Sequence, residues 1–239
     1  MSGHSKWATI KRKKGATDAK KGAVFTKLVK NITIAARNGK DPDMNPALRS
    51  AMDQAKVANM PKDNVEKAIL KGAGELPGVV YEEVVFEAYG PGGIAMIIEC
   101  VTDNNNRTVS FVRSSLTKHG GSLGGSGSVM YMFEQKGVIR IASEDIPNQD
   151  ELELAVIDAG AEDIQVEEEG VTIITGRADL NTIVQMLEKM NITPASFGVE
   201  YITNTMLDPD ESASSTLSSL IEVLEDNEDV NSVHTNANL

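Results

Sequence analysis

The sequence predicts an α+β protein in which an N-terminal three-helix domain is followed by two α/β-sandwich, ferredoxin-like domains, the third inserted in the second. Three observations predict this arrangement. Apolar residues recur at helical spacing through the first 72 residues. Residues 137–206 then follow the order strand, helix, strand, strand, helix, strand, which is the ferredoxin-like split βαβ motif. One more helix and one more strand follow this motif.

Three helices are expected in the N-terminal block, at residues 18–38, 45–59 and 61–72. The first has one apolar face at helical spacing, formed by Phe25, Leu28, Val29, Ile32, Ala35 and Ala36. The second begins with Asn45 as its N-cap and Pro46 at its first helical position. Residues 73–78 contain Gly and Pro and are expected to form a linker.

Beyond the linker the pattern changes to short apolar runs that are typical of strands. We expect strands at 81–89 and 93–103, a helix at 105–119 and a strand over Ser128–Phe133. These elements are too few to cover their own sheet, so the C-terminal helix and strand are expected to complete it. The sequence therefore predicts three domains, at 1–75, at 79–135 together with 206–239, and at 137–205.

The composition is that of an ordinary globular protein, with 41% of the 239 residues hydrophobic and 24% charged. No run approaches the roughly 18 apolar residues that a membrane span needs. Cys100 is the only cysteine, which excludes an internal disulfide framework and a Cys-based zinc site, and it is expected to be buried in a strand. The N-terminus has no apolar signal stretch, and it is Lys-rich rather than Arg-rich. These features favour a cytoplasmic protein over a secreted one or a mitochondrial transit peptide.

Charge is divided unevenly along the chain. Residues 1–72 hold 16 Lys and Arg against 6 Asp and Glu, a net charge of +10. The remaining residues have a net charge of −22, so the overall value of −12 conceals a basic domain joined to an acidic body. This asymmetry points to a nucleic acid or another anionic partner, with a general solubility pattern as the alternative.

The basic residues begin in an N-terminal arm, residues 1–22, and continue onto the first helix. On that helix Lys27 and Lys30 lie opposite the apolar face. We expect one connected basic surface that contacts phosphates through Lys6, Lys11, Arg12, Lys13, Lys14, Lys20, Lys21, Lys27 and Lys30.

Arg107 and Trp7 complete the candidate binding residues. Arg107 lies in TDNNNRT, where Asp and Asn are suited to turns and helix caps. An anion contact by Arg107 is possible, but a structural role is favoured. Trp7 stacks on a base or anchors the arm onto the helical bundle, and the anchor is slightly favoured.

No motif supports an enzyme. The glycine-rich loop His119–Gly127 resembles a phosphate cradle, but it lacks the following Lys-Ser/Thr and leads from a helix into a strand, so a flexible connection is favoured. The three histidines lie in separate segments without the spacing of metal ligands. The sequence therefore predicts no catalytic residue, no metal, no cofactor and no small-molecule substrate.

Several stretches together resemble the YebC/PmpR family, which includes the mitochondrial translational activator of cytochrome oxidase subunit I. They are GHSKW, IKRKKGATDAKKG, DPDMNPALR, NMPKDNVEKAI, YGPGG, TDNNNRT, GSVMYMF and LEDNEDV. Two departures are Ala88, where the family often has Gly, and Tyr131, where many members have Trp, and both look like packing variations. The resemblance implies a helical domain followed by two related α/β domains. It also implies a role linked to nucleic acid, since bacterial members are described as DNA-binding transcriptional regulators and others act on stalled ribosomes.

The residues and the resemblance together predict a nucleic-acid-binding regulator of gene expression, in the first place a DNA-binding transcriptional regulatory protein. One alternative is a ribosome-associated translation factor that contacts rRNA or tRNA and relieves stalling. A second alternative is a protein–protein adaptor that uses its acidic α/β domains. No membrane partner is predicted.

Overall fold

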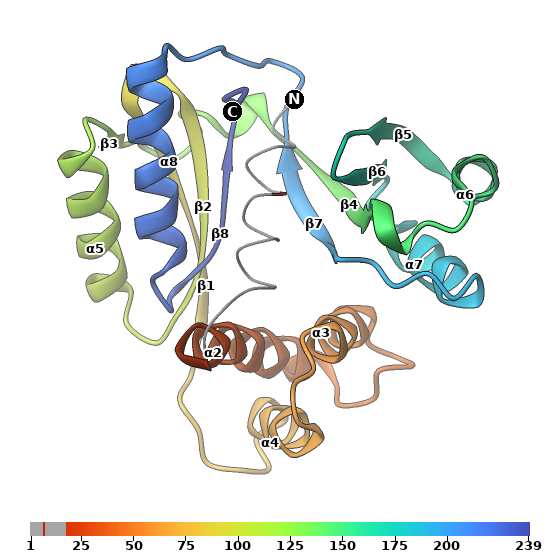
Figure 1. The fold of residues 1–239 in the computed structure, drawn as a ribbon. Coiled ribbons are helices and arrows are strands. Elements are labelled where there is room, and N and C mark those ends of the chain that lie inside the picture. The colour runs from red at the N-terminus through yellow and green to blue at the C-terminus, as the bar shows by residue number, and fades with distance from the viewer. Residues whose placement is uncertain (1–6, 8–17) are drawn as a thin grey trace.

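The structure, a computed structural model, describes Trp7 and residues 18–239, with side chains at all of these except 18–20. The predicted fold class is confirmed. A helical N-terminal region is followed by two antiparallel four-stranded sheets with helices packed on them (Figure 1). The exact division into domains stays a prediction, and we keep the names helical, middle and third domain for the segments 1–75, 79–135 with 206–239, and 137–205.

The helical domain consists of α2 (Asp18–Ala35), a 3₁₀ turn (Ala36–Asn38), α3 (Pro46–Val57) and α4 (Lys62–Gly72). Asn45 caps α3 as predicted, since its side chain accepts a hydrogen bond from the backbone N–H of Leu48 at 3.1 Å. α2 and α4 cross closely at Gly72, where a Cβ atom would lie only 2.2 Å from the carbonyl oxygen of Thr33. No larger residue fits at this crossing without a shift of the backbone.

The sheet of the middle domain joins two distant parts of the chain. Its order is β3-β1-β2-β8, with bounds β1 (Glu82–Tyr89), β2 (Ala95–Thr102), β3 (Ser122–Leu123) and β8 (Val230–Thr235). The C-terminal strand β8 pairs with β2, as expected from the incomplete first block. The helices α5 (Asn105–Lys118) and α8 (Glu211–Glu225) pack on one face, and the core between them includes Met96, Ile98, Leu116, Leu217 and Leu224.

The sheet of the third domain has the ferredoxin-like order β5-β6-β4-β7. Its elements are β4 (Glu134–Ala142), α6 (Gln149–Asp158), β5 (Ala161–Val166), β6 (Gly170–Thr175), α7 (Leu180–Lys189) and β7 (Ser196–Ile202), with a 3₁₀ turn (Ser143–Asp145) after β4. Alternate β4 residues Ile139 and Ile141 are buried beneath α6 and α7. β4 begins three residues before the predicted start of this domain.

Residues 128–133 do not form the predicted strand. They contain a 3₁₀ turn (Met130–Met132), and the short edge strand β3 lies earlier, inside the glycine-rich loop. The cause is the carboxylate of Glu87, which accepts hydrogen bonds from the backbone N–H groups of Gly127 (2.5 Å), Val129 (2.8 Å) and Met130 (2.8 Å). These N–H groups are therefore unavailable to a strand ladder. The same N–H groups bind the Glu87 carboxylate in the way that the N–H groups of a phosphate cradle bind phosphate.

The helical domain lies against both sheets (Figure 1). α2 contacts β2 of the middle domain, and α3 contacts β7 of the third domain. β7 and β8 meet where the two sheets adjoin. Because one small bundle touches both α/β domains, part of its polar surface is used for packing and is lost to any partner.

Candidate nucleic-acid interface

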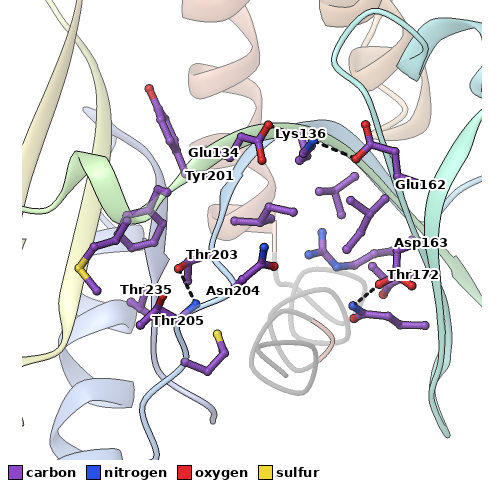
Figure 2. A pocket seen from close by; sticks show the side chains of 18 of the residues that line it. Glu134, Lys136, Glu162, Asp163, Thr172, Tyr201, Thr203, Asn204, Thr205 and Thr235 are labelled. Atoms are coloured by element: carbon purple, nitrogen blue, oxygen red, sulfur yellow. Dashed lines mark hydrogen bonds and ion pairs between the residues drawn. The ribbon is translucent and has the colours of Figure 1, made fainter.

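A pocket of about 1040 Å³ lies over the outer face of the third-domain sheet, between the turn at Met130–Met132 and the segment 203–206 (Figure 2). Its two cations, Lys136 and Arg140, lie four residues apart on β4 and project from the same face of the strand. Lys136 Nζ lies 3.0 Å from Glu134 Oε1 and 2.9 Å from Glu162 Oε2. Arg140 binds Glu200 through two hydrogen bonds, of 2.6 and 3.0 Å.

The pocket therefore offers little to a polyanion. Each of its cations is neutralised by a neighbouring carboxylate, and Asp163 adds a further negative charge to the lining. Burying phosphates beside carboxylates would cost free energy through like-charge repulsion. The net positive charge of the chain is concentrated in the helical domain instead.

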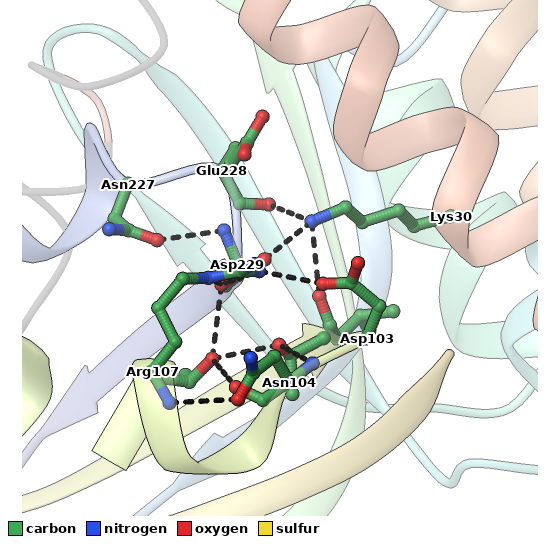
Figure 3. A network of polar contacts seen from close by, with 10 residues as sticks. Lys30, Asp103, Asn104, Arg107, Asn227, Glu228 and Asp229 are labelled. Atoms are coloured by element: carbon green, nitrogen blue, oxygen red, sulfur yellow. Dashed lines mark hydrogen bonds and ion pairs between the residues drawn. The ribbon is translucent and has the colours of Figure 1, made fainter. Parts of the chain in front are cut away.

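The lysine face of α2 is an interface with the middle domain. Lys30 is only 5% exposed, and its Nζ lies 2.7 Å from Asp229 Oδ1 (Figure 3). It also donates to the backbone oxygens of Glu228 at 2.9 Å and Val101 at 3.3 Å. One turn earlier, the half-buried Lys27 donates to the carbonyl oxygen of Glu225 at the end of α8, where the helix dipole favours a cation. The prediction that Lys30 contacts phosphates from an exposed face is therefore wrong.

Asp229 collects three donors from two domains (Figure 3). Besides Lys30, it accepts hydrogen bonds from Arg107, with Nη2 at 2.7 Å, and from the hydroxyl of Thr108 at 3.0 Å. Burial by itself would raise the pKa of the Asp229 carboxyl, but Lys30 and Arg107 together hold the pKa below its ordinary value. Arg107 also pairs with Asp103 at 2.7 Å, so its guanidinium is bound to two carboxylates of the same chain. This is the structural role that the sequence favoured.

The TDNNNRT segment begins α5 as expected from its composition. The side chain of Asn104 accepts a hydrogen bond from the backbone N–H of Arg107 at 3.1 Å and so caps the helix. The guanidinium of Arg107 is then directed from the first turn of α5 to Asp229. Capping and ion pairing together account for this segment without an external anion.

Trp7 is an anchor, but it is anchored to the third domain and not to the bundle. Its side chain is 2% exposed, and its Nε1–H donates to Glu167 Oε2 at 2.6 Å. The ring lies against Gly170 at the start of β6, where a Cβ atom would come within 2.8 Å of it. Trp7 therefore anchors the arm as expected, but to the third domain and not to the helical bundle. The sequence alone does not show which domain supplies the hydrogen-bond acceptor.

Most of the arm falls outside the described residues. Lys6, Lys11, Arg12, Lys13 and Lys14 lie there, and Lys20 is described only by its backbone in α2. Lys21 is exposed near the start of α2.

Three exposed lysines lie on α4, outside the basic surface predicted from the sequence. Lys62, Lys67 and Lys71 have no carboxylate partner among the described residues, whereas most other cations of the bundle do. They contribute to the net charge of +10, whereas the predicted basic surface comprises only the arm and the first helix. The sequence does indicate them, because α4 has few buried positions and its lysines fall on the positions that remain exposed.

These features define a three-domain α+β protein whose positive charge is concentrated in its helical domain. The comparison with protein families identifies it further. Residues 5–75 match the TACO1/YebC protein N-terminal domain, and residues 81–237 match the TACO1/YebC second and third domain. The chain belongs to the TACO1/YebC family, as the resemblance implied.

Bacterial relatives match over nearly their whole length. A probable transcriptional regulatory protein of Acidobacterium capsulatum is 48% identical over 99% of this chain and 96% of its own. One from Geobacter sulfurreducens is 49% identical over 99% and 95%. A crystal structure of the conserved hypothetical protein Aq1575 from Aquifex aeolicus has a TM-score of 0.86 and 42% identity, covering 92% of this chain and 91% of that one.

Among the residues that the structure describes, no helix is both long enough and apolar enough to cross a membrane. Cys100 is buried in β2, as expected, and is 2% exposed.

Proposed function

We propose that this protein is a regulator of gene expression that binds DNA, acts in the cytoplasm and has no enzymatic activity. The helical domain would contact the phosphate backbone without reading base sequence, because neither a helix-turn-helix nor an RNA-recognition fingerprint is present in the sequence. The bacterial relatives named as probable transcriptional regulatory proteins support this role.

The observation that carries the proposal is the separation of charge. A net charge of +10 belongs to the first 72 residues, while the rest of the chain carries −22. Within the helical domain, the lysines of α4 are exposed and have no carboxylate partner among the described residues. A polyanion would be attracted to this domain and repelled by the other two, which orients the protein on its target.

The proposed contacts come from the arm and from α4. They are Lys6, Lys11, Arg12, Lys13, Lys14, Lys20 and Lys21, together with Lys62, Lys67 and Lys71. Lys27, Lys30 and Arg107 are left out because they bind the middle domain, and Trp7 because it is buried.

The test is a salt series of binding to a duplex of mixed sequence. Changing Lys62, Lys67 and Lys71 to Gln together is expected to weaken binding. The slope of log K against log salt should fall by about 0.9 for each lysine that contacts a phosphate. The matched control changes the exposed cations Arg113, Lys118 and Lys189 to Gln, which removes the same charge from the acidic domains. An equal loss in both triple variants would contradict the proposed surface.

DNA and the ribosome are distinguished as targets by comparing retention on the duplex with co-sedimentation with ribosomes at equal ionic strength. Retention on the duplex without co-sedimentation with ribosomes would support the transcriptional role. Co-sedimentation without retention would instead identify a translation factor. A protein that did neither would have to be an adaptor, and the proposal would fail.

A further inference from the structure

Trp7 ties the start of the basic arm to an acidic domain. Its indole is almost fully buried and makes a 2.6 Å hydrogen bond to Glu167. Glu167 is followed directly in the sequence by Glu168 and Glu169, so the segment that holds the indole carries three consecutive acidic residues. We call Glu167 and Gly170, which contact the indole, the Trp7 seat.

The charges on the two sides of this contact are opposite. Residues 8–17, which follow Trp7 in the chain, carry four cations and no acid, whereas residues 137–205 carry 3 Lys and Arg against 14 Asp and Glu, a net charge of −11. Attraction between these opposite charges favours the state in which the Trp7 indole is bound in its seat. A nucleic acid that binds the same cations competes with the third domain for them.

The chain length limits how far these cations can lie from the seat. Lys11 follows Trp7 by four residues and therefore lies within about 14 Å of it, and Lys14 lies within about 25 Å. Electrostatic interactions extend over about 8 Å at physiological salt and about 30 Å at 0.01 M. A phosphate backbone bound to these cations would thus be held near the glutamates beside the seat, where like charges repel.

We propose that the third domain restrains the arm through the Trp7 seat, and that nucleic acid and Glu167 compete, so that binding releases the indole. The inference rests on the proposed function, because it assigns a regulation to the same basic arm. Coupling between the two events is reciprocal, so a protein with a weakened seat must bind nucleic acid more tightly.

Trp7 reports on its own state, since it is the only tryptophan in the chain. Its fluorescence in the free protein is expected at short wavelength and shielded from acrylamide. Addition of a 20-base-pair duplex at low salt should shift the emission to longer wavelength and increase quenching by acrylamide. The same change should occur in free Glu167→Ala without any duplex.

Affinity supplies the second measurement. Glu167→Ala is expected to bind the duplex about fivefold more tightly than the unchanged protein, at the lower end of typical coupling between sites. The matched control is Glu151→Ala, which removes one exposed carboxylate of the third domain from α6, on the opposite face of the sheet. Thermal unfolding of both variants establishes that they are folded.

The outcomes separate the two proposals. If the duplex binds but Trp7 remains shielded, or if both variants gain affinity equally, the seat does not compete and the inference is overturned while the DNA-binding function stands. If neither the unchanged protein nor any variant binds nucleic acid at low salt, the proposed function fails and the inference fails with it. Release of Trp7 with a gain confined to Glu167→Ala supports both.

Discussion

Lys30 Nζ and Asp229 Oδ1 lie 2.7 Å apart, with side chains that are 6% and 4% exposed, although 199 residues separate them in the sequence. Removing two charges from water is costly, so such a pair persists only where further hydrogen bonds satisfy both groups. Backbone oxygens of Val101 and Glu228 do this for Lys30, while Arg107 and Thr108 do it for Asp229. The pair therefore connects the helical domain to both parts of the middle domain.

Replacing Lys30 by Met should destabilise the protein by about 3 kcal/mol, because Asp229 would lose one of its two cations while remaining buried. The free energy of unfolding is measured by denaturant titration. Lys62→Met, at an exposed site of the same domain, should change it by less than about 0.5 kcal/mol. Similar stability of the two variants would show that the buried pair contributes little to holding the domains together.

Stability should decline in acid partly through Asp229. Its pKa is lower in the folded protein than the ordinary value of 3.8, so its contribution is fully present above that value and is lost as the pH falls through the folded pKa. Below pH 3.8, the free energy of unfolding of the unchanged protein should therefore fall more steeply than that of Asp229→Asn, by at most about 1.4 kcal/mol per pH unit. Asp150→Asn, at an exposed position, provides the comparison for a general charge effect. Parallel curves for the Asp229 variant and the unchanged protein would contradict the prediction.

Replacing Glu87 by Ala should cost about 3 kcal/mol and loosen the glycine-rich loop, since the backbone N–H groups of Gly127, Val129 and Met130 would lose their acceptor. Hydrogen exchange at these amides should accelerate together with the loss of stability. Glu83→Ala removes an exposed carboxylate from the same strand and should leave exchange in the loop unchanged. Unaltered protection in the Glu87 variant would mean that the loop is held by other contacts.

Cys100 should be unreactive in the folded protein. Burial first, and then the charge of Asp229, raises the pKa of its thiol to about 12. At pH 8 the fraction of thiolate is then about a thousandfold lower than for a free cysteine, and access is also blocked. A thiol reagent should modify the protein only after denaturant is added. Modification of the native protein at the rate of a free thiol would show that β2 opens readily.

Local patterns predicted most of the elements because their signals are local. Asn45 and Asn104 were expected at helix starts and are found as caps, since capping depends on neighbouring backbone N–H groups. The strand expected at Ser128–Phe133 was wrong because Glu87, some 40 residues earlier, takes the hydrogen bonds that a ladder would need. A propensity for β structure carries no information about such a distant acceptor.

At the candidate interface, too, local sequence patterns did not reveal contacts with distant residues. The helical spacing placed Lys30 opposite the apolar face of α2, and only the packed structure shows that a second domain covers that side. The exposed lysines of α4 emerged in the same way, from their lack of carboxylate partners among the described residues. A helical projection shows the direction of a side chain, but it does not show what lies there.

By itself, the sequence determined the order of helices and strands, the membership of the C-terminal strand in the middle sheet, and the division of charge between a basic domain and an acidic body. These depend on periodicity and composition, which are properties of the chain. Only the tertiary structure decided which cations remain for a partner and where Trp7 is held. The physical reason is that burial and ion pairing depend on groups brought together by folding, as Lys30 is to Asp229 and Trp7 to Glu167.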